Sequence, residues 1–206
     1  MNINNLIENN IKFQQKIVPT IKNDLLDLAQ NGQKPQILFI TCSDSRINPD
    51  LIFNTKPGDI FVVRNIGNFV AKYGEEYSEC ACAIEYALEV LDIKHIIVCG
   101  HSKCGACATI HQSIDNPKLK NIQKWLKLTK DIKKDALEVN KNNGKDLYQT
   151  TEKISIIHQL KNLETFPNVK SRLENNKLKI DGWYYDIQNG NIEAYDKIKN
   201  DFTKLT

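Results

Sequence analysis

The sequence predicts an α/β protein with a mostly parallel central sheet flanked by helices, an N-terminal helical arm and a C-terminal strand hairpin. Three continuous apolar, β-prone runs, at 37–41, 60–63 and 95–99, are typical of strands buried on both faces of a sheet. Residues 76–91 between the last two runs have the apolar spacing of a helix. Strands that alternate with helices indicate a parallel sheet.

The flanking elements follow from periodicity and from glycine and proline. Apolar residues at helical spacing over 3–30, interrupted by Pro19, predict two short amphipathic helices that end at Asn31-Gly32. A further helix is expected to begin near Ser102. The Lys- and Asn-rich segment 115–150 predicts a helical excursion on the surface, to which we assign no chemistry.

The C-terminal part is expected to hold a helix, a strand and a hairpin. The helix spans about 151–165 and is expected to stop at Pro167. Residues 178–187 and 190–194 predict the final strand and hairpin.

The length of 206 residues favours a single domain, 1–206, in which 1–32 is the arm and 33–206 the α/β core. The apolar fraction is 41% and the charged fraction 26%, which excludes a disordered chain. A net charge of +3, with no dense basic block, gives no support for a nucleic-acid partner or a membrane surface.

The cysteines are expected to be reduced. No stretch is apolar enough for a membrane span and the N-terminus lacks a signal-peptide pattern, so we expect a cytoplasmic protein. Because cytoplasmic thiols stay reduced, the six cysteines are interpreted as metal ligands, nucleophiles or buried thiols, and not as a disulfide framework.

Three candidate metal ligands follow two of the predicted strands. Cys42 comes directly after the first strand, and His101 and Cys104 follow the third. The carboxyl ends of parallel strands meet at one edge of the sheet, where ligands of α/β proteins gather. The sequence therefore predicts a Cys-His-Cys site for zinc, with a fourth coordination position left open for catalysis. A closed structural site, completed by Cys107, is the alternative.

Arginine is rare in this chain, which makes its positions informative. Only three of the 28 basic residues are arginine, and Arg46 lies two residues after Asp44. A planar guanidinium can hold a carboxylate through two hydrogen bonds, which keeps that carboxylate ionised beside a metal. The alternative is an ordinary surface ion pair near a turn.

Taken together, these residues resemble the β-class carbonic anhydrases, of the plant type. The resemblance rests on Cys42-x-Asp44-x-Arg46 and His101-x-x-Cys104-Gly105, and it extends to the stretches 57–65, 84–87 and 181–186. It implies one zinc per subunit, held by Cys42, His101 and Cys104, and the reversible hydration of carbon dioxide to bicarbonate and a proton. It also implies that a zinc-bound hydroxide attacks carbon dioxide, oriented by Asp44 and Arg46.

The resemblance implies further site residues and an oligomer. Its open-site subgroup is indicated because Phe39 stands where closed-site enzymes have a Trp. The substrate-binding residues that it implies are Gln33, Phe61, Ile66, Tyr86 and Gly105. For Phe61, Ile66 and Tyr86, an ordinary place in the core is the alternative. A homodimer or higher homo-oligomer is expected, with the catalytic cleft at the interface between subunits.

Two other functions stay open at this level. A carbon disulfide or carbonyl sulfide hydrolase would share the zinc ligands and the Asp44-Arg46 pair. A non-catalytic zinc-binding homologue would keep the ligands but would not need the pair. A nucleotide-binding protein is not supported, because no glycine-rich phosphate loop follows the first strand.

Overall fold

The computed structural model describes residues 1–75, 79–144 and 146–205. Backbone contacts divide the chain into two units, Met1–Lys34 and Pro35–Thr206, which we describe separately. The arm boundary expected after residue 32 stays a prediction. No helix in the described ranges has the length and apolar character that a membrane span requires.

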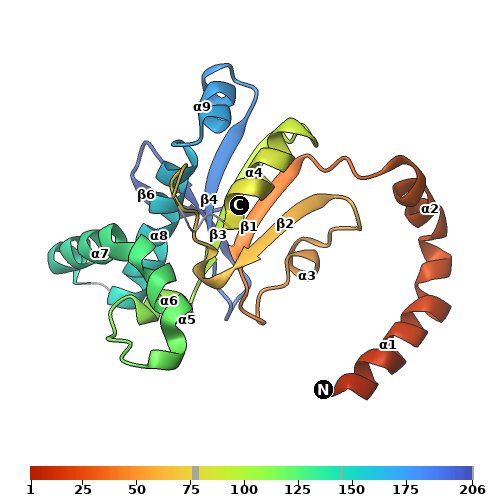
Figure 1. Cartoon of the computed structure of the whole chain (residues 1–206), viewed down its shortest axis with the longest axis horizontal. Coiled ribbons are helices and arrows are strands. Elements are labelled where there is room, and N and C mark those ends of the chain that lie inside the picture. The colour runs from red at the N-terminus through yellow and green to blue at the C-terminus, as the bar shows by residue number, and fades with distance from the viewer. Residues whose placement is uncertain (76–78, 145, 206) are drawn as a thin grey trace. The chain divides into compact units, whose positions relative to one another are not determined.

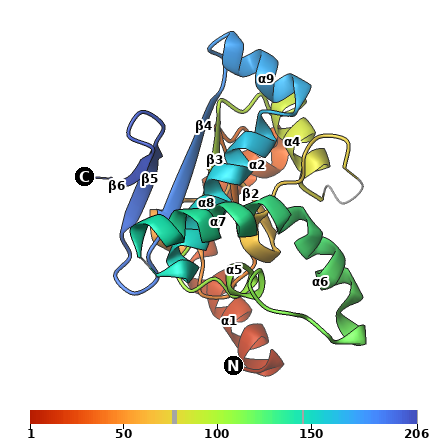
Figure 2. The same cartoon turned by 90° about the vertical axis from the view of Figure 1, so that its left-hand side faces the viewer.

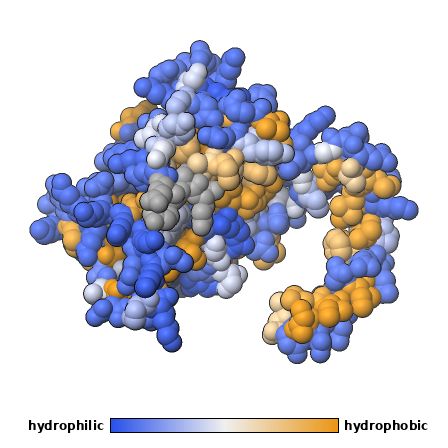
Figure 3. Space-filling model, in the orientation of Figure 1, coloured by the Kyte–Doolittle hydropathy of each residue, from blue (hydrophilic) through white to orange (hydrophobic). Residues whose placement is uncertain are grey.

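The first unit consists of two helices, α1 (Ile3–Lys16) and α2 (Lys22–Asn31), joined by the short 3-10 helix η1 (Val18–Thr20). Asn2 and Asn5 cap the start of α1 reciprocally, each side chain accepting a hydrogen bond from the other's backbone N–H. Gly32, with φ of 74°, ends α2. Figure 3 shows apolar side chains along α1. The exposed ones are Ile3, Leu6, Ile7, Ile11 and Phe13.

The second unit is built on a six-stranded sheet in the order β2-β1-β3-β4-β5-β6 (Figure 1). The first four strands in this order pair in parallel, and β5 and β6 add an antiparallel hairpin. The α/β fold expected from the sequence is therefore confirmed. The strands are β1 (Ile37–Cys42), β2 (Ile60–Asn65), β3 (His95–His101), β4 (Lys179–Tyr185), β5 (Ile192–Asp196) and β6 (Asp201–Lys204).

The helices of this unit pack against the sheet or against one another (Figure 2). They are α3 (Pro49–Phe53), α4 (Glu79–Glu89), α5 (Gly105–Thr109), α6 (Lys120–Trp125), α7 (Lys130–Asn143), α8 (Leu147–Leu163) and α9 (Pro167–Glu174). Three 3-10 turns, η2 (Ile66–Asn68), η3 (Pro117–Leu119) and η4 (Leu126–Thr129), lie between them.

The core follows the alternation of side chains along the strands. Leu38 and Ile40 of β1 point to one face of the sheet, where they pack in a cluster with residues of α4, α8 and α9. Phe39 points to the other face, where its ring contacts Phe53 of α3 and Trp183 of β4. Because both faces are covered, Leu38–Ile40 of β1 and Ile96–Cys99 of β3 are runs of consecutive apolar residues.

Several boundaries differ from the prediction. Pro167 begins α9 instead of ending the preceding helix, which stops at Leu163. Proline fits the first turn of a helix because the N–H it lacks would have no partner there. The short helix α3 and the edge strand β6 were not predicted. The expected start of a helix at 76 falls on residues 76–78, outside the described ranges.

We expect Gly182→Ala to lower the free energy of unfolding by about 1–3 kcal/mol, measured by urea denaturation. A Cβ at this position of β4 would lie 2.6 Å from Cγ2 of Ile156 on α8. Combining it with Ile156→Ala removes that atom, so the double variant should lose less than the two single losses added together. Strict additivity would contradict the steric explanation.

Candidate metal centre

Cys42 is the last residue of β1, and its side chain is buried. The backbone N–H of Gly67, in the turn that follows β2, donates a hydrogen bond to its Sγ over 3.4 Å. Immediately after Cys42 the chain leaves the sheet, held by a 2.8 Å hydrogen bond from the N–H of Ser43 to the carbonyl of Asn65. The thiol is thus fixed at the carboxyl edge of the sheet.

His101 is the last residue of β3 and presents one ring nitrogen without a partner. Its Nδ1 lies 2.9 Å from the carbonyl oxygen of Ser102, which can only accept, so Nδ1 carries the proton. Its Nε2 is buried and has no hydrogen-bond partner within the described part of the chain. A buried nitrogen with a free lone pair is costly unless a ligand such as a metal ion binds it.

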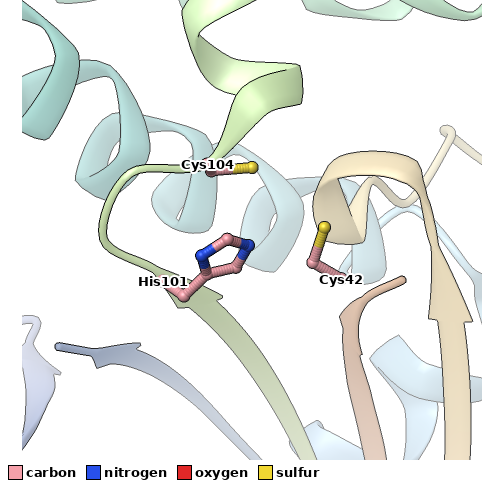
Figure 4. A group of neighbouring side chains, drawn as sticks. All are labelled: Cys42, His101 and Cys104. Carbon is pink, nitrogen blue, oxygen red and sulfur yellow. The ribbon is translucent and has the colours of Figure 1, made fainter. Parts of the chain in front are cut away.

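Cys104 comes next to these two groups through a tight turn. Lys103, between His101 and Cys104, adopts the left-handed conformation with φ of 57°, which turns the chain back toward the sheet. Figure 4 shows the three side chains pointing toward one another from the ends of β1 and β3 and the start of α5. The two Sγ atoms and a ring nitrogen all lie within 4.8 Å of one another.

The donor set fits zinc. Two thiols and an imidazole are the ligands that zinc prefers, and the spacing needs only small shifts to reach bond lengths of about 2.0–2.3 Å. The neighbouring thiol of Cys104, and burial, raise the pKa of Cys42 to about 12. A divalent cation would offset this charge repulsion and hold both sulfurs as thiolates.

Cys107 does not complete a fourth ligand position. It is buried one turn along α5, but the group of converging ligand atoms comprises Cys42, His101 and Cys104 alone in the ranges that the structure describes. The geometry therefore favours a site of three protein ligands over the closed alternative.

Asp44 and Arg46 form the paired arrangement that the sequence predicts. Nε and Nη2 of Arg46 donate to the two carboxylate oxygens of Asp44 over 2.9 and 2.6 Å. Nη2 also donates to the carbonyl of Lys103, in the turn between the two later ligands. The hydrogen bonds from Arg46 hold the pKa of Asp44 well below its usual range.

This pair adjoins the ligand cluster. Oδ2 of Asp44 lies 4.0 Å from Nε2 of His101, the ring nitrogen without a partner. An ionised carboxylate therefore stands next to the place where a metal ion would bind, with both its oxygens already held by Arg46. The pair lies at a turn, with the Arg46 side chain 47% exposed and that of Asp44 17% exposed, but it adjoins the ligand cluster.

The structure places the predicted substrate-binding residues in three separate locations. Gly105 directly follows Cys104, and Ile66, 45% exposed, stands beside Gly67 near Cys42. Phe61 and Tyr86 pack against each other with ring centroids 5.9 Å apart. Cys42 pairs with Asn65 of β2, which is four residues beyond Phe61, so Phe61 lies about 13 Å along the strand from the level of Cys42.

Gln33 is the remaining predicted substrate-binding residue, and a place in the core is the alternative for the three apolar ones. Gln33 belongs to the first unit, so its role stays a prediction. Tyr86 and Ile66 are each 45% exposed and are not ordinary core residues. Phe61 is partly buried against the main core cluster.

Glu152 is a neighbour of the site that the sequence did not indicate. Its buried carboxylate accepts one hydrogen bond from the N–H of Cys104 and one from the hydroxyl of Tyr184, both over 2.9 Å. Burial raises its pKa. In the sequence it is one acidic residue within a helix, and only the packing of α8 against β3 and β4 brings it below Cys104.

Comparison with known proteins agrees with this geometry. The carbonic anhydrase family profile matches residues 37–192. The chain belongs to the β-carbonic anhydrase family. It is 41% identical to a carbonic anhydrase of Synechocystis, over 96% of this chain and 72% of the relative. It is 34% identical to one of Pseudomonas aeruginosa, over 97% and 90%.

Solved structures of β-carbonic anhydrases share the fold. The β-carbonic anhydrase CcaA superposes with a TM-score of 0.93 at 40% identity, covering 99% of this chain and 92% of that one. A structure from Sordaria macrospora, described as tetrameric, gives 0.82 at 27% identity, covering 93% and 95%. This chain is accordingly an enzyme of a zinc-dependent family whose general reaction is the hydration of carbon dioxide.

Zinc content should distinguish the ligand His101 from the neighbouring residue Cys107. We expect the wild-type protein and Cys107→Ser to retain about one zinc per chain after dialysis, whereas His101→Ala loses most of it. Zinc content is measured by mass spectrometry of the purified proteins, with circular dichroism as the folding control. If Cys107→Ser loses as much zinc as His101→Ala, Cys107 is a fourth ligand and the closed-site alternative is correct.

Proposed function

We propose that this chain catalyses the reversible hydration of carbon dioxide at one zinc per subunit, held by Cys42, His101 and Cys104. The observation that carries the proposal is the Nε2 of His101, which has no hydrogen-bond partner among the described residues. It faces two thiols and lies 4.0 Å from the ionised carboxylate of Asp44. Three protein ligands leave one tetrahedral position for water. Zinc in such a site supplies a Lewis acid that activates water for attack on the carbon of carbon dioxide.

Asp44 is proposed to orient the reacting water. A carboxylate can only accept hydrogen bonds, so Asp44 fixes which way an O–H beside it points. Because Arg46 donates to both carboxylate oxygens through its Nε and Nη2, Asp44 stays ionised and is kept from becoming a metal ligand itself. Oδ1 also accepts from the backbone N–H of Arg46 over 3.0 Å, so Oδ2 is the oxygen that keeps a lone pair for the substrate side.

Arg64 is proposed to keep this arrangement open. Its guanidinium donates to the backbone carbonyls of Cys42, Asp44 and Ile47 over 2.8–3.1 Å. For Asp44 to swing onto the metal, both the Arg46 pair and this set of bonds would have to change. The ring of Phe39, packed between Phe53 and Trp183, is consistent with the open-site subgroup.

We also propose that the complete substrate pocket forms between two copies of the chain. Within one copy, Phe61 lies about 13 Å along β2 from the level of Cys42, with the ring of Tyr86 packed against it, so this pair does not wall the metal site of that copy. The homodimer expected from the family would bring the pair from the partner subunit. The exposed ring of Tyr86 is then covered by association.

We expect Asp44→Asn to retain zinc while kcat/KM for carbon dioxide hydration falls by about 10- to 100-fold. The amide cannot accept through both atoms and loses the charge that pairs with Arg46. Stopped-flow assays on proteins of matched zinc content provide the measurement. Full activity in this variant would refute the role given to Asp44.

Hydration is expected to persist as the pH is lowered from 9 to near 7. Because the pKa of Asp44 is depressed, its folded-state charge is present above its ordinary pKa and is lost only in strong acid, so this pH range leaves the pair with Arg46 intact. Activity confined to pH above about 8 would show that Asp44 moves onto the metal. Turnover of carbon disulfide or carbonyl sulfide, without hydration at any pH, would replace the proposed substrate.

A further inference from the structure

We infer that Trp125 is a positioning residue for the metal centre, and this inference rests on the proposed zinc site. It would hold the turn after β2 so that the N–H of Gly67 stays on the Sγ of Cys42. Trp125 ends α6, in the Lys- and Asn-rich segment to which the sequence assigned no chemistry.

Trp125 holds this turn from the outside through two contacts. Its indole Nε1–H donates to the carbonyl of Ile66 over 2.7 Å, across 59 positions of sequence. Its ring packs over Phe69, with centroids 6.0 Å apart and an interplanar angle of 32°. A single side chain thus fixes both ends of the 66–69 turn.

Asn65 holds the same turn from the inside. Its side-chain oxygen accepts from the N–H of Phe69 over 2.9 Å, and its amide donates to the carbonyl of Phe69 over 2.8 Å. Gly67 has φ of 84°, and a Cβ there would lie 2.6 Å from the ring of Phe69. The contacts of Asn65 and Trp125 therefore leave the backbone of the 66–69 turn little room to move.

The turn matters to the metal centre because it carries the donor to Cys42. The Gly67 N–H lies 3.4 Å from Sγ of Cys42, and Figure 4 shows the turn after β2 curling past that sulfur. A hydrogen bond to a metal-bound thiolate withdraws electron density from the sulfur and lowers its donation to the metal. Trp125 therefore acts on the metal through Ile66, Gly67 and Cys42.

The test replaces the indole by a ring that cannot donate, in Trp125→Phe, with Trp183→Phe as the matched control. Trp183 is the other tryptophan of the chain, and its ring packs on Phe39 and Phe53. Both variants and the wild type are loaded with cobalt(II), and the thiolate-to-cobalt charge-transfer bands are recorded. We expect a shift to longer wavelength in Trp125→Phe alone, because a sulfur with a weaker hydrogen bond is more easily oxidised.

Zinc affinity gives a second readout on the same proteins. Competition with a chelator should show an affinity about 10-fold lower in Trp125→Phe, because the turn that holds the Sγ of Cys42 in place for the metal is loosened. Unshifted cobalt bands in a folded Trp125→Phe protein would overturn the inference. Absence of a thiolate-to-cobalt band in the wild-type protein would instead contradict the proposed metal site itself.

A measurement on the wild-type chain covers the case in which Trp125→Phe does not fold. Labelling tryptophan with ¹⁵N gives two indole N–H signals, assigned with Trp183→Phe. We expect the Trp125 signal to exchange slowly with deuterium and to move when zinc is added, while the Trp183 signal stays in place. A Trp125 signal that exchanges rapidly and ignores zinc would contradict the assignment.

Discussion

The parallel pairing of β1 with β3 is the constraint on which the rest of the site depends. The ladder runs from Ile37 opposite His95 to Thr41 opposite Cys99, so Cys42 and His101 leave neighbouring strands at the same edge of the sheet. A register shift of one residue in either strand would turn the side chain of its ligand to the opposite face. The apolar residues of β1 and β3, buried on both faces, prevent such a shift, and in this way the core fixes the geometry of a polar site.

Charge is the second organising factor, because the site concentrates acidic groups. Two thiols and Asp44 lie around the His101 ring, and the buried Glu152 accepts from the N–H of Cys104. The guanidinium of Arg46 is hydrogen-bonded to Asp44. Arg46 neutralises Asp44, so the two sulfurs, once ionised, would lack a positive partner. A divalent cation between the sulfurs would balance the remaining charge, which explains why ligands, carboxylate pair and buried glutamate occur together.

The sequence indicated those parts of the site that adjacent residues encode. Cys42, Asp44 and Arg46 follow one apolar run and His101 and Cys104 follow another, so strand order alone brings them together. Glu152 and Trp125 could not be found in this way, because each is an ordinary helical residue until α8 or α6 packs. Pro167 was misjudged because proline both stops and starts helices, and β6 is too short and polar to show an apolar run.

The central claim, an open zinc site made by three side chains, is tested most directly by X-ray absorption at the zinc edge of the purified enzyme. The account requires two sulfur neighbours at about 2.3 Å and two lighter neighbours at about 2.0–2.1 Å, one of them imidazole. His101→Ala would serve as the control that loses the imidazole signature. Three sulfur neighbours in the wild-type spectrum would contradict the account, because the site would then be closed by protein and could not activate water.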